Sequence, residues 1–417
     1  MCDIFRFSVL IDMGWKVFLP DRYIRPVENK IREIAGSLGN RIPNEGGLIG
    51  GKAGLACFYA YYADWSGDRV FDSLVADLIE QALNPASGHV PELRFSSGMS
   101  GVTWLIHNLS ANGLSCWDTA SVFDELDTHL YTYMISEMKS GHYDYLHGAL
   151  GVALYFLRQP KNERYRIYLT ELLSVLSGIA NREHDGALKW ISVLDEKKKK
   201  EGYNLSLSHG MASVMLILSK IHAEGIAEDA TDKLIRGGLK YIDKQKLPPG
   251  KSISAFPSWA LESMAEDSHS RLAWCYGDLG IGLAYLRAGD VLASSAYQLD
   301  GLNLLLETTK RREPGDNHVF DAGICHGAAG LALVYNVLYQ ETELNSFKDA
   351  SLYWLDLCLG MASHDDGIAG YKAWHHPDFG GWKASSGLLD GAAGIGLSLL
   401  SFVSERKPEW AASLLVL

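Results

Sequence analysis

The chain has 417 residues, of which 47% are hydrophobic and 21% charged, and its formal net charge at pH 7 is −12. This composition excludes an intrinsically disordered chain and supplies enough apolar material for a large core. The chain is acidic and has no basic arm or stripe. Nucleic acid is therefore excluded as a partner, because phosphate backbones require clustered Lys and Arg.

The N-terminal stretch MCDIFRFSVLIDMGWKVFLP is apolar only in places. Asp3, Arg6, Asp12 and Lys16 interrupt it well short of a signal peptide or of a membrane span of ~20 residues. We therefore expect a cytoplasmic protein without a transmembrane segment. Six cysteines are too few for a disulfide scaffold in a cytoplasmic chain of this length, so their thiols are available for packing, metal binding or catalysis.

A small-residue signature followed by an apolar helical run recurs seven times along the chain. The first glycines of the seven copies are Gly51, Gly98, Gly148, Gly210, Gly277, Gly327 and Gly391. Six copies read G-x-x-G, and the fourth has Ser213 in place of the second glycine. Two small residues three positions apart lie on one helix face, so a neighbouring backbone can approach there. The spacing between copies leaves room for two helices and two loops in each repeat.

Amphipathic stretches separate the signatures. One example has apolar side chains three and four positions apart at Ile24, Val27, Ile31, Ile34 and Leu38. Such stretches predict outer helices, whereas the signature helices are more uniformly apolar, as in an inner layer. Neither terminal repeat is polar as a solenoid cap would be, which favours closure into a ring. We expect an all-α protein of seven helix-hairpin repeats that forms a single domain over residues 1–417.

Two segments depart from the helical pattern. Residues 187–194 and 203–208 flank a highly charged stretch and predict a small β-hairpin. Residues 246–270 are rich in Pro and Ser and predict a long loop.

Alignment of the repeats on their first glycines exposes candidate metal ligands. Cys275 and Cys325 each lie two residues before the first glycine of their repeat, and His326 follows Cys325. In a closed ring, equivalent positions share one rim, so these cysteines of adjacent repeats become neighbours. Two thiolates and one imidazole suit Zn²⁺ and leave a fourth tetrahedral position open, as in catalytic zinc sites. The alternative, that both are ordinary buried cysteines, is disfavoured by the equivalent positions and the adjacent histidine.

His209 has the position of His326 in the fourth repeat, but no cysteine precedes it. We expect it to act as an acid or base beside the zinc ion rather than as a ligand. His147 has the same position in the third repeat, where a histidine that lines the cavity is the simpler interpretation. The other cysteines, at positions 2, 57, 116 and 358, are expected to be packing or surface residues.

A polar, Gly-rich segment near the C-terminus contains Trp374, Phe379 and Trp382. These side chains fit either an aromatic wall for a peptide or ordinary loop packing. A second metal site at the adjacent His375 and His376 is not expected, because the repeats supply no matching ligands.

Four motifs together are similar to those of the lanthionine synthetase C-like proteins, specifically the stand-alone bacterial lanthipeptide cyclases. The motifs are WCYG (274–277), CHGAAG (325–330), SHG (208–210) and LLDGAAG (388–394). The resemblance covers nearly the whole chain, including all seven repeats. It implies an α/α toroid of seven inner and seven outer helices with zinc at the top of the cavity. It supports Cys275, Cys325 and His326 as ligands and His209 as the acid or base.

The resemblance implies three further site residues. Asp144 is similar to the family aspartate that partners the histidine, Arg271 to the active-site arginine and Tyr276 to the active-site tyrosine. Some members carry an inserted β-rich domain, whereas this chain has room only for a hairpin and loops. How a leader peptide is held therefore stays open.

The implied activity is zinc-dependent closure of thioether rings in a dehydrated precursor peptide that carries a leader. Cysteine thiolates of the peptide add to dehydroalanine or dehydrobutyrine and form (methyl)lanthionine. Zinc prepares the thiolate, His209 oriented by Asp144 delivers a proton to Cα, and Arg271 stabilises the developing negative charge. No redox or nucleotide cofactor is expected. A lanthipeptide dehydratase and an export transporter are candidate partners, which would bring the cytoplasmic enzyme to the inner membrane face.

Three other functions are compatible with parts of this pattern. The nearest is a zinc enzyme that adds glutathione to dehydroamino acids in proteins. Another is a different α/α-toroid enzyme with an Asp-Cys-His zinc site, such as a prenyltransferase β subunit, but the adjacent Cys325 and His326 argue against it. The non-catalytic alternative is a toroid that only binds a peptide, and a fourth protein ligand on the zinc ion would favour it.

Overall fold

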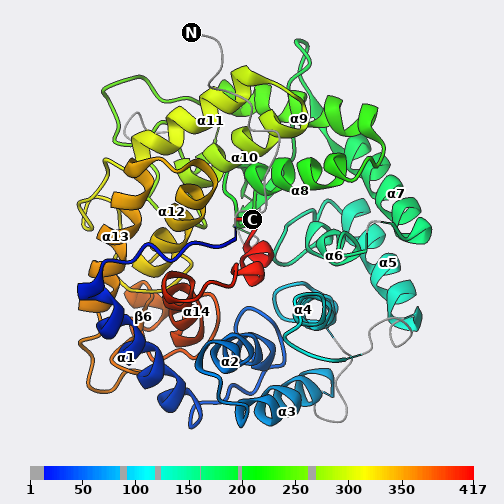
Figure 1. Ribbon diagram of the computed structural model, residues 1–417. Coiled ribbons are helices and arrows are strands. Elements are labelled where there is room, and N and C mark those ends of the chain that lie inside the picture. Colours follow the sequence, from blue (N-terminus) through cyan, green and yellow to red (C-terminus); the bar gives the residue numbers. More distant parts are fainter. Residues whose placement is uncertain (1–13, 85–91, 118–123, 160, 196–199, 262–268) are drawn as a thin grey trace. The chain divides into compact units, whose positions relative to one another are not determined.

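The computed structural model describes residues 14–84, 92–117, 124–159, 161–195, 200–261 and 269–417. Within these ranges, outer and inner α-helices alternate along the chain (Figure 1). The inner helices are α2 (Lys52–Ser66), α4 (Met99–Ala111), α6 (Ala149–Phe156), α8 (Met211–Ala223), α10 (Asp278–Val291), α12 (Ala328–Thr342) and α14 (Ala392–Val403). The outer helices are α1 (Asp21–Leu38), α3 (Phe71–Leu83), α5 (Asp124–Lys139), α7 (Glu163–Ile179), α9 (Glu228–Asp243), α11 (Ser295–Thr308) and α13 (Asn345–Gly360).

Each inner helix begins directly after the first glycine of a repeat, which is the N-cap residue. The preceding turn folds back so that the first helical N–H bonds to the carbonyl six residues before that glycine, as Met99 does to Glu92 at 2.7 Å. A Cβ atom on Gly98 would overlap the same carbonyl oxygen. The expected close approach of a backbone is confirmed, and the approaching backbone is the turn that precedes the same helix.

The inner helices are buried almost throughout, as their uniformly apolar sequences predict. Every residue of α6 is buried. The outer helix α1 instead buries one stripe, at Val27, Ile31, Ile34, Ala35 and Leu38. No helix in the described part of the chain combines the length and the apolar character that are needed to cross a membrane.

The few strands are short. Strand β1 (Asn181–Arg182) pairs with β2 (Leu188–Lys189), β4 (Lys200–Asn204) pairs with β3 (Ser192–Asp195) and β5 (Trp259–Ala260), and β6 (Ala373–Trp374) pairs with β7 (Trp382–Lys383), all antiparallel. Two 3₁₀ helices, η1 (Pro377–Phe379) and η2 (Glu409–Leu414), complete the described elements.

The expected hairpin exists with shifted boundaries. Its first segment is split into β2 and β3 around Trp190, whose buried side chain donates a hydrogen bond to the carbonyl of Leu176 at 3.0 Å. Its second strand ends at Asn204, and residues 205–208 instead form the turn that enters α8. The expected loop 246–270 contains β5, and its residues 262–268 lie outside the described part of the chain.

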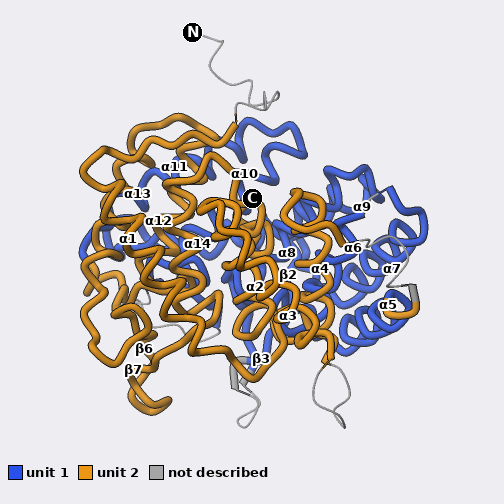
Figure 2. Tube along the Cα trace, turned by 60° about the horizontal axis from the view of Figure 1, so that its bottom comes forward, with its two compact units in different colours: residues 1–13, 127–313 blue, residues 14–126, 314–417 orange. Residues whose placement is uncertain are grey.

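Residue contacts divide the chain into two compact units (Figure 2). Unit 1 comprises residues 127–313 of the described chain, and unit 2 comprises residues 14–126 and 314–417. In unit 1, α8 packs against α6 and α10. In unit 2, α14 packs against α12 and α2, and α2 packs against α4, so the first and last repeats are neighbours (Figure 1). The expectation of a single domain stays a prediction.

Backbone hydrogen bonds join the inner turns of several neighbouring repeats within each unit. In each of these bonds, the carbonyl two residues before a first glycine accepts N–H groups from the equivalent turn of the adjacent repeat. In unit 2, Leu389 accepts from Cys325 at 3.0 Å, and Ile49 accepts from Leu389 at 3.2 Å. In unit 1, Cys275 accepts from Ser208 at 3.1 Å. These bonds place equivalent residues of neighbouring repeats side by side, as the alignment on the first glycines predicts.

One buried carboxylate joins three helices of unit 1. Asp127 on α5 is 2% exposed and accepts hydrogen bonds from Tyr155 on α6 at 2.7 Å and from Tyr165 on α7. It also pairs with Arg164 at 2.6 Å. The sequence analysis did not identify this residue.

Asp127→Ala should reduce the free energy of unfolding by about 3 kcal/mol, because it leaves two hydroxyls and a guanidinium without their acceptor. Thermal unfolding followed by circular dichroism should show a fall in Tm of several degrees. The matched control is Glu125→Ala, which removes an exposed carboxylate from the same helix and should leave Tm nearly unchanged. Equal Tm values for the two variants would contradict the structural role of Asp127.

Candidate active site and metal centre

A histidine and an aspartate form a hydrogen-bonded pair in unit 1. His209 lies in the turn that enters α8, and Asp144 lies in the equivalent turn that enters α6. The His209 Nδ1 atom is 2.7 Å from Asp144 Oδ2, and Asp144 Oδ1 accepts the backbone N–H of His147 at 2.8 Å. The backbone N–H of His209 donates to Ser206 Oγ at 3.1 Å. The pair is therefore held at both residues. Among the described residues, none is hydrogen-bonded to Nε2 of His209, which can serve another group.

The electrostatics of this pair favour a charged histidine. Burial by itself would raise the pKa of Asp144, but the hydrogen bonds from His209 and from the backbone of His147 hold that pKa below its ordinary value. Burial by itself would lower the pKa of His209, but the hydrogen bond to the Asp144 carboxylate and its negative charge raise that pKa above the ordinary value. His209 is thus a group whose protonated form is favoured by its surroundings and which can act as a proton donor.

Cys275 and Tyr276 lie beside this pair in the turn that enters α10. The Cys275 carbonyl accepts the N–H groups of Leu207 and Ser208 at 3.1 Å each, which ties its turn to that of His209. The ring of Tyr276 is 6.4 Å from that of His209. Burial raises the pKa of Tyr276, so its hydroxyl is protonated at neutral pH. Unit 1 therefore brings Asp144, His209 and Tyr276 together, as the family resemblance implies.

Arg271 is half-buried and lies six residues before the first glycine of its repeat. The equivalent residues of the fourth and sixth repeats are Asn204 and Asp321. Asn204 Nδ2 lies 3.4 Å from the hydroxyl of Tyr276. Asn204 and Asp321 lie outside the two positions directly before each first glycine and were not predicted from the sequence. Alignment of the repeats at this earlier position is the signal that could have identified them.

Cys325 and His326 lie in unit 2, in the turn that enters α12. The backbone N–H of Cys325 donates to Leu389 at 3.0 Å. The His326 Nε2 atom is 3.3 Å from the carbonyl oxygen of Trp374 and 3.6 Å from Asp321 Oδ2. Because a carbonyl can only accept, Nε2 carries the proton in this contact, and the neutral ring has its lone pair at Nδ1.

Three of the predicted residues form a group that could hold a metal ion. Each of Cys275, Cys325 and His326 offers one ligand atom, and these atoms lie within 4.8 Å of one another. Cys57 and Cys358 are buried elsewhere, and burial raises the pKa of both thiols, to about 12 for Cys358. Cys116 is exposed, and Cys2 lies outside the described part of the chain.

The other aromatic and histidine candidates have local contacts. The ring of His147 stacks on that of His209 at 5.4 Å. Trp374 packs against Phe320 with ring centroids 4.8 Å apart, and Trp382 packs against His364 at 4.7 Å. Phe379 is 72% exposed. Neither these contacts nor this exposure decides between a peptide-binding wall and loop packing, and the wall stays a prediction.

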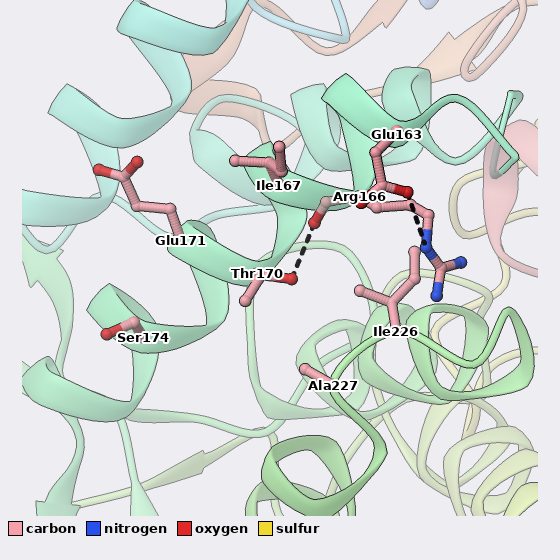
Figure 3. A pocket seen from close by; sticks show the side chains of 8 residues that line it. All are labelled: Glu163, Arg166, Ile167, Thr170, Glu171, Ser174, Ile226 and Ala227. Carbon is pink, nitrogen blue, oxygen red and sulfur yellow. Dashed lines mark hydrogen bonds and ion pairs between the residues drawn. The ribbon is translucent and has the colours of Figure 1, made fainter.

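A pocket of about 580 Å³ lies on α7 and on the turn before α9 (Figure 3). The residues that line it are Glu163, Arg166, Ile167, Thr170, Glu171, Ser174, Ile226 and Ala227. The Arg166 guanidinium donates to the carbonyls of Glu224 and Gly225, directly after the end of α8, at 2.9 and 2.8 Å. None of the predicted site residues lines this pocket, and it has no part in the chemistry considered below.

The comparisons with known proteins agree with the motifs. The family model for lanthionine synthetase C-like protein matches residues 42–415. The chain is 27% identical over 204 residues to the nisin biosynthesis protein NisC of Lactococcus lactis subsp. lactis. This match covers 45% of the chain and 47% of that protein, so the chain matches about half the length of this curated relative.

The fold is similar to that of nisin cyclase, an α/α toroid, with a TM-score of 0.74 and 19% identity. The likeness covers 94% of this chain and 98% of that chain and confirms the expected fold class. With the family model matched over almost its whole length, the chain belongs to the lanthionine synthetase C-like family.

Proposed function

We propose that this protein is a zinc-dependent lanthipeptide cyclase that closes thioether rings in a dehydrated precursor peptide. The observation that carries the proposal is the His209–Asp144 pair, whose histidine lies in the turn that is hydrogen-bonded to the turn of Cys275. Membership of the lanthionine synthetase C-like family supports it, as do the similarities to NisC and nisin cyclase.

The donor set of Cys275, Cys325 and His326 fits zinc. Two thiolates and one imidazole are soft and borderline donors, which suit Zn²⁺ better than the oxygen-preferring Mg²⁺ or Ca²⁺. Three protein ligands leave one tetrahedral position for a substrate group. A zinc ion held there would lower the pKa of a substrate thiol, which is mostly protonated at neutral pH when free.

Residues of the chain would then donate a proton to Cα and stabilise the negative charge of the enolate. The substrate sulfur forms a bond to Cβ of dehydroalanine or dehydrobutyrine, and the electron pair of the C=C bond moves to an enolate. His209, held by Asp144 through Nδ1, donates a proton from Nε2 to Cα. Arg271 stabilises the enolate oxygen, and Tyr276 orients the reacting groups. The thiol releases its proton to solvent, and His209 regains one proton from solvent after it has protonated Cα. No atom is gained or lost, so the whole reaction is an isomerisation.

The substrate is the dehydrated precursor with its leader, and the aromatic side chains Trp374, Phe379 and Trp382 are proposed to hold its apolar segments. A lanthipeptide dehydratase that supplies this substrate and a transporter that exports the product are proposed partners. The reaction would take place in the cytoplasm, where free cysteines of the precursor remain reduced.

Purified protein should contain about one zinc ion per chain, as a single Cys₂His site requires. Cys275→Ala and Cys325→Ala should each lose this zinc, because two protein ligands cannot retain it. Metal content by inductively coupled plasma mass spectrometry is the measurement, and far-ultraviolet circular dichroism should show that the helices persist. The matched control is Cys116→Ala, which removes an exposed cysteine and should retain full zinc. Full zinc in either ligand variant would rule out the assigned ligands.

His209→Asn should retain zinc and lose cyclisation by about 10²–10⁴-fold, the usual contribution of a general acid. The control is His142→Asn, because the side chain of His142 is 64% exposed and pairs only with Glu137 among the described residues. Zinc content and the rate of thiol loss from the precursor are measured in parallel. Zinc loss in His209→Asn as large as in His326→Ala would show that His209 is a ligand and not the acid.

The reaction should leave the mass of the peptide unchanged and reduce the number of its free thiols. A dehydrated precursor treated with the enzyme should keep its mass while the number of cysteines labelled by an alkylating reagent falls. Cys325→Ala should leave all cysteines available for labelling. If the peptide gains the mass of glutathione when glutathione is supplied, and no thiols are lost without it, the protein is a glutathione-adding relative. Tight binding without either change would indicate a peptide-binding protein.

A further inference from the structure

Asp321 is a buried carboxylate of unit 2 that the proposed reaction does not use. It is 3% exposed and lies six residues before Gly327. Its Oδ1 atom accepts the backbone N–H of Gly323 at 2.9 Å, and its Oδ2 atom accepts the backbone N–H of Trp374 at 2.7 Å. The same Oδ2 atom lies 3.6 Å from His326 Nε2.

The equivalent residues of two other repeats show which oxygen of Asp321 is needed to cap the turn and which is not. Asn204 Oδ1 accepts the N–H of Ser206 at 2.9 Å, and Ser385 Oγ accepts the N–H of Gly387 at 3.3 Å. One side-chain oxygen is therefore enough to cap this turn, and in Asp321 the Oδ1 atom has that function. The turn does not require the second oxygen, which lies between strand β6 and the ring of His326.

The second oxygen and the Trp374 carbonyl both lie on the Nε2 side of the His326 ring. The Nε2–H group of His326 donates to the Trp374 carbonyl at 3.3 Å, and the N–H of that same Trp374 is held by Asp321. The negative charge of Asp321 beside Nε2 also favours a proton on that nitrogen. Both effects keep the proton at Nε2 and leave the lone pair at Nδ1.

We propose that Asp321 is a positioning residue of the metal centre, which fixes the ring and tautomer of His326 so that Nδ1 is the ligand atom. This inference rests on the proposed metal site. Carboxylates and carbonyls that accept the second N–H of a metal-binding histidine raise the basicity of the ligand and fix its orientation. Removal of such a partner costs about 10–100-fold in metal affinity.

The decisive variant is Asp321→Ser, which copies the seventh repeat. Its hydroxyl can cap Gly323 as Ser385 caps Gly387, but it provides no oxygen near Trp374 and His326. The matched control is Ser385→Ala, which removes a turn cap at the equivalent position and should leave His326 and its contacts unchanged. Zinc affinity is measured on metal-free protein by competition with a chelator, and the Tm of the metal-free protein reports the fold.

Asp321→Ser should bind zinc about 10–100-fold more weakly than the parent, while Ser385→Ala should bind it as tightly as the parent. A second readout needs no metal. In ¹⁵N-histidine-labelled metal-free protein at pH 8, the His326 resonances, identified by their absence from His326→Ala, should show a proton on Nε2. In Asp321→Ser, they should show a mixture of the two tautomers.

Parent zinc affinity in Asp321→Ser, or an equal loss of affinity in Ser385→Ala, would overturn the role of Asp321 while leaving the proposed function intact. A parent with its proton on Nδ1 of His326 would also overturn it. A parent that binds no zinc would instead contradict the metal site itself, and with it both proposals.

Discussion

The structure depends on the turn that precedes each inner helix. Its backbone folds back onto the first glycine of the repeat. Two residues before such a glycine, the carbonyls of Ile49, Ser96, Cys275 and Leu389 accept N–H groups from the neighbouring turn. A buried backbone carbonyl needs such a partner, so the bond both stabilises the turn and fixes the separation of neighbouring repeats. Residues in two turns joined in this way are thereby held at defined positions relative to each other. The candidate site is built from those places.

The repeats share a backbone but assign different chemistry to the same positions. Directly before the first glycine, the third, fourth and sixth repeats each have a histidine. His147 stacks on His209, His209 pairs with Asp144, and His326 belongs to the group of residues that could hold a metal ion. The helices bury their apolar surface irrespective of these side chains, so the turn residues are free to serve function. Equivalent positions can therefore have different chemical roles without a change in the fold.

Burial separates reactive groups from inert ones. Cys57 on α2 and Cys358 on α13 are fully buried, and desolvation raises the pKa of each thiol and disfavours a thiolate. His209 and Asp144 are half-buried, but their mutual hydrogen bond and the backbone N–H of His147 outweigh desolvation and favour the charged forms. The turns can supply such partners because their backbone N–H groups are not all consumed by helix formation.

The seven repeats and the inner and outer helices could be predicted from the sequence, because their periodicity is visible there. Equivalent positions in the repeats likewise predicted that Cys275, Cys325 and His326 lie together. Family motifs added Asp144 and Tyr276. The tertiary structure alone decided that Asp144 bonds Nδ1 of His209, that the second strand of the hairpin ends at Asn204, and that Asp321 lies beside His326. These features depend on where a turn brings a side chain of one segment against another. For Asp321 and Trp374 the two segments are 53 residues apart, and no local pattern encodes their contact.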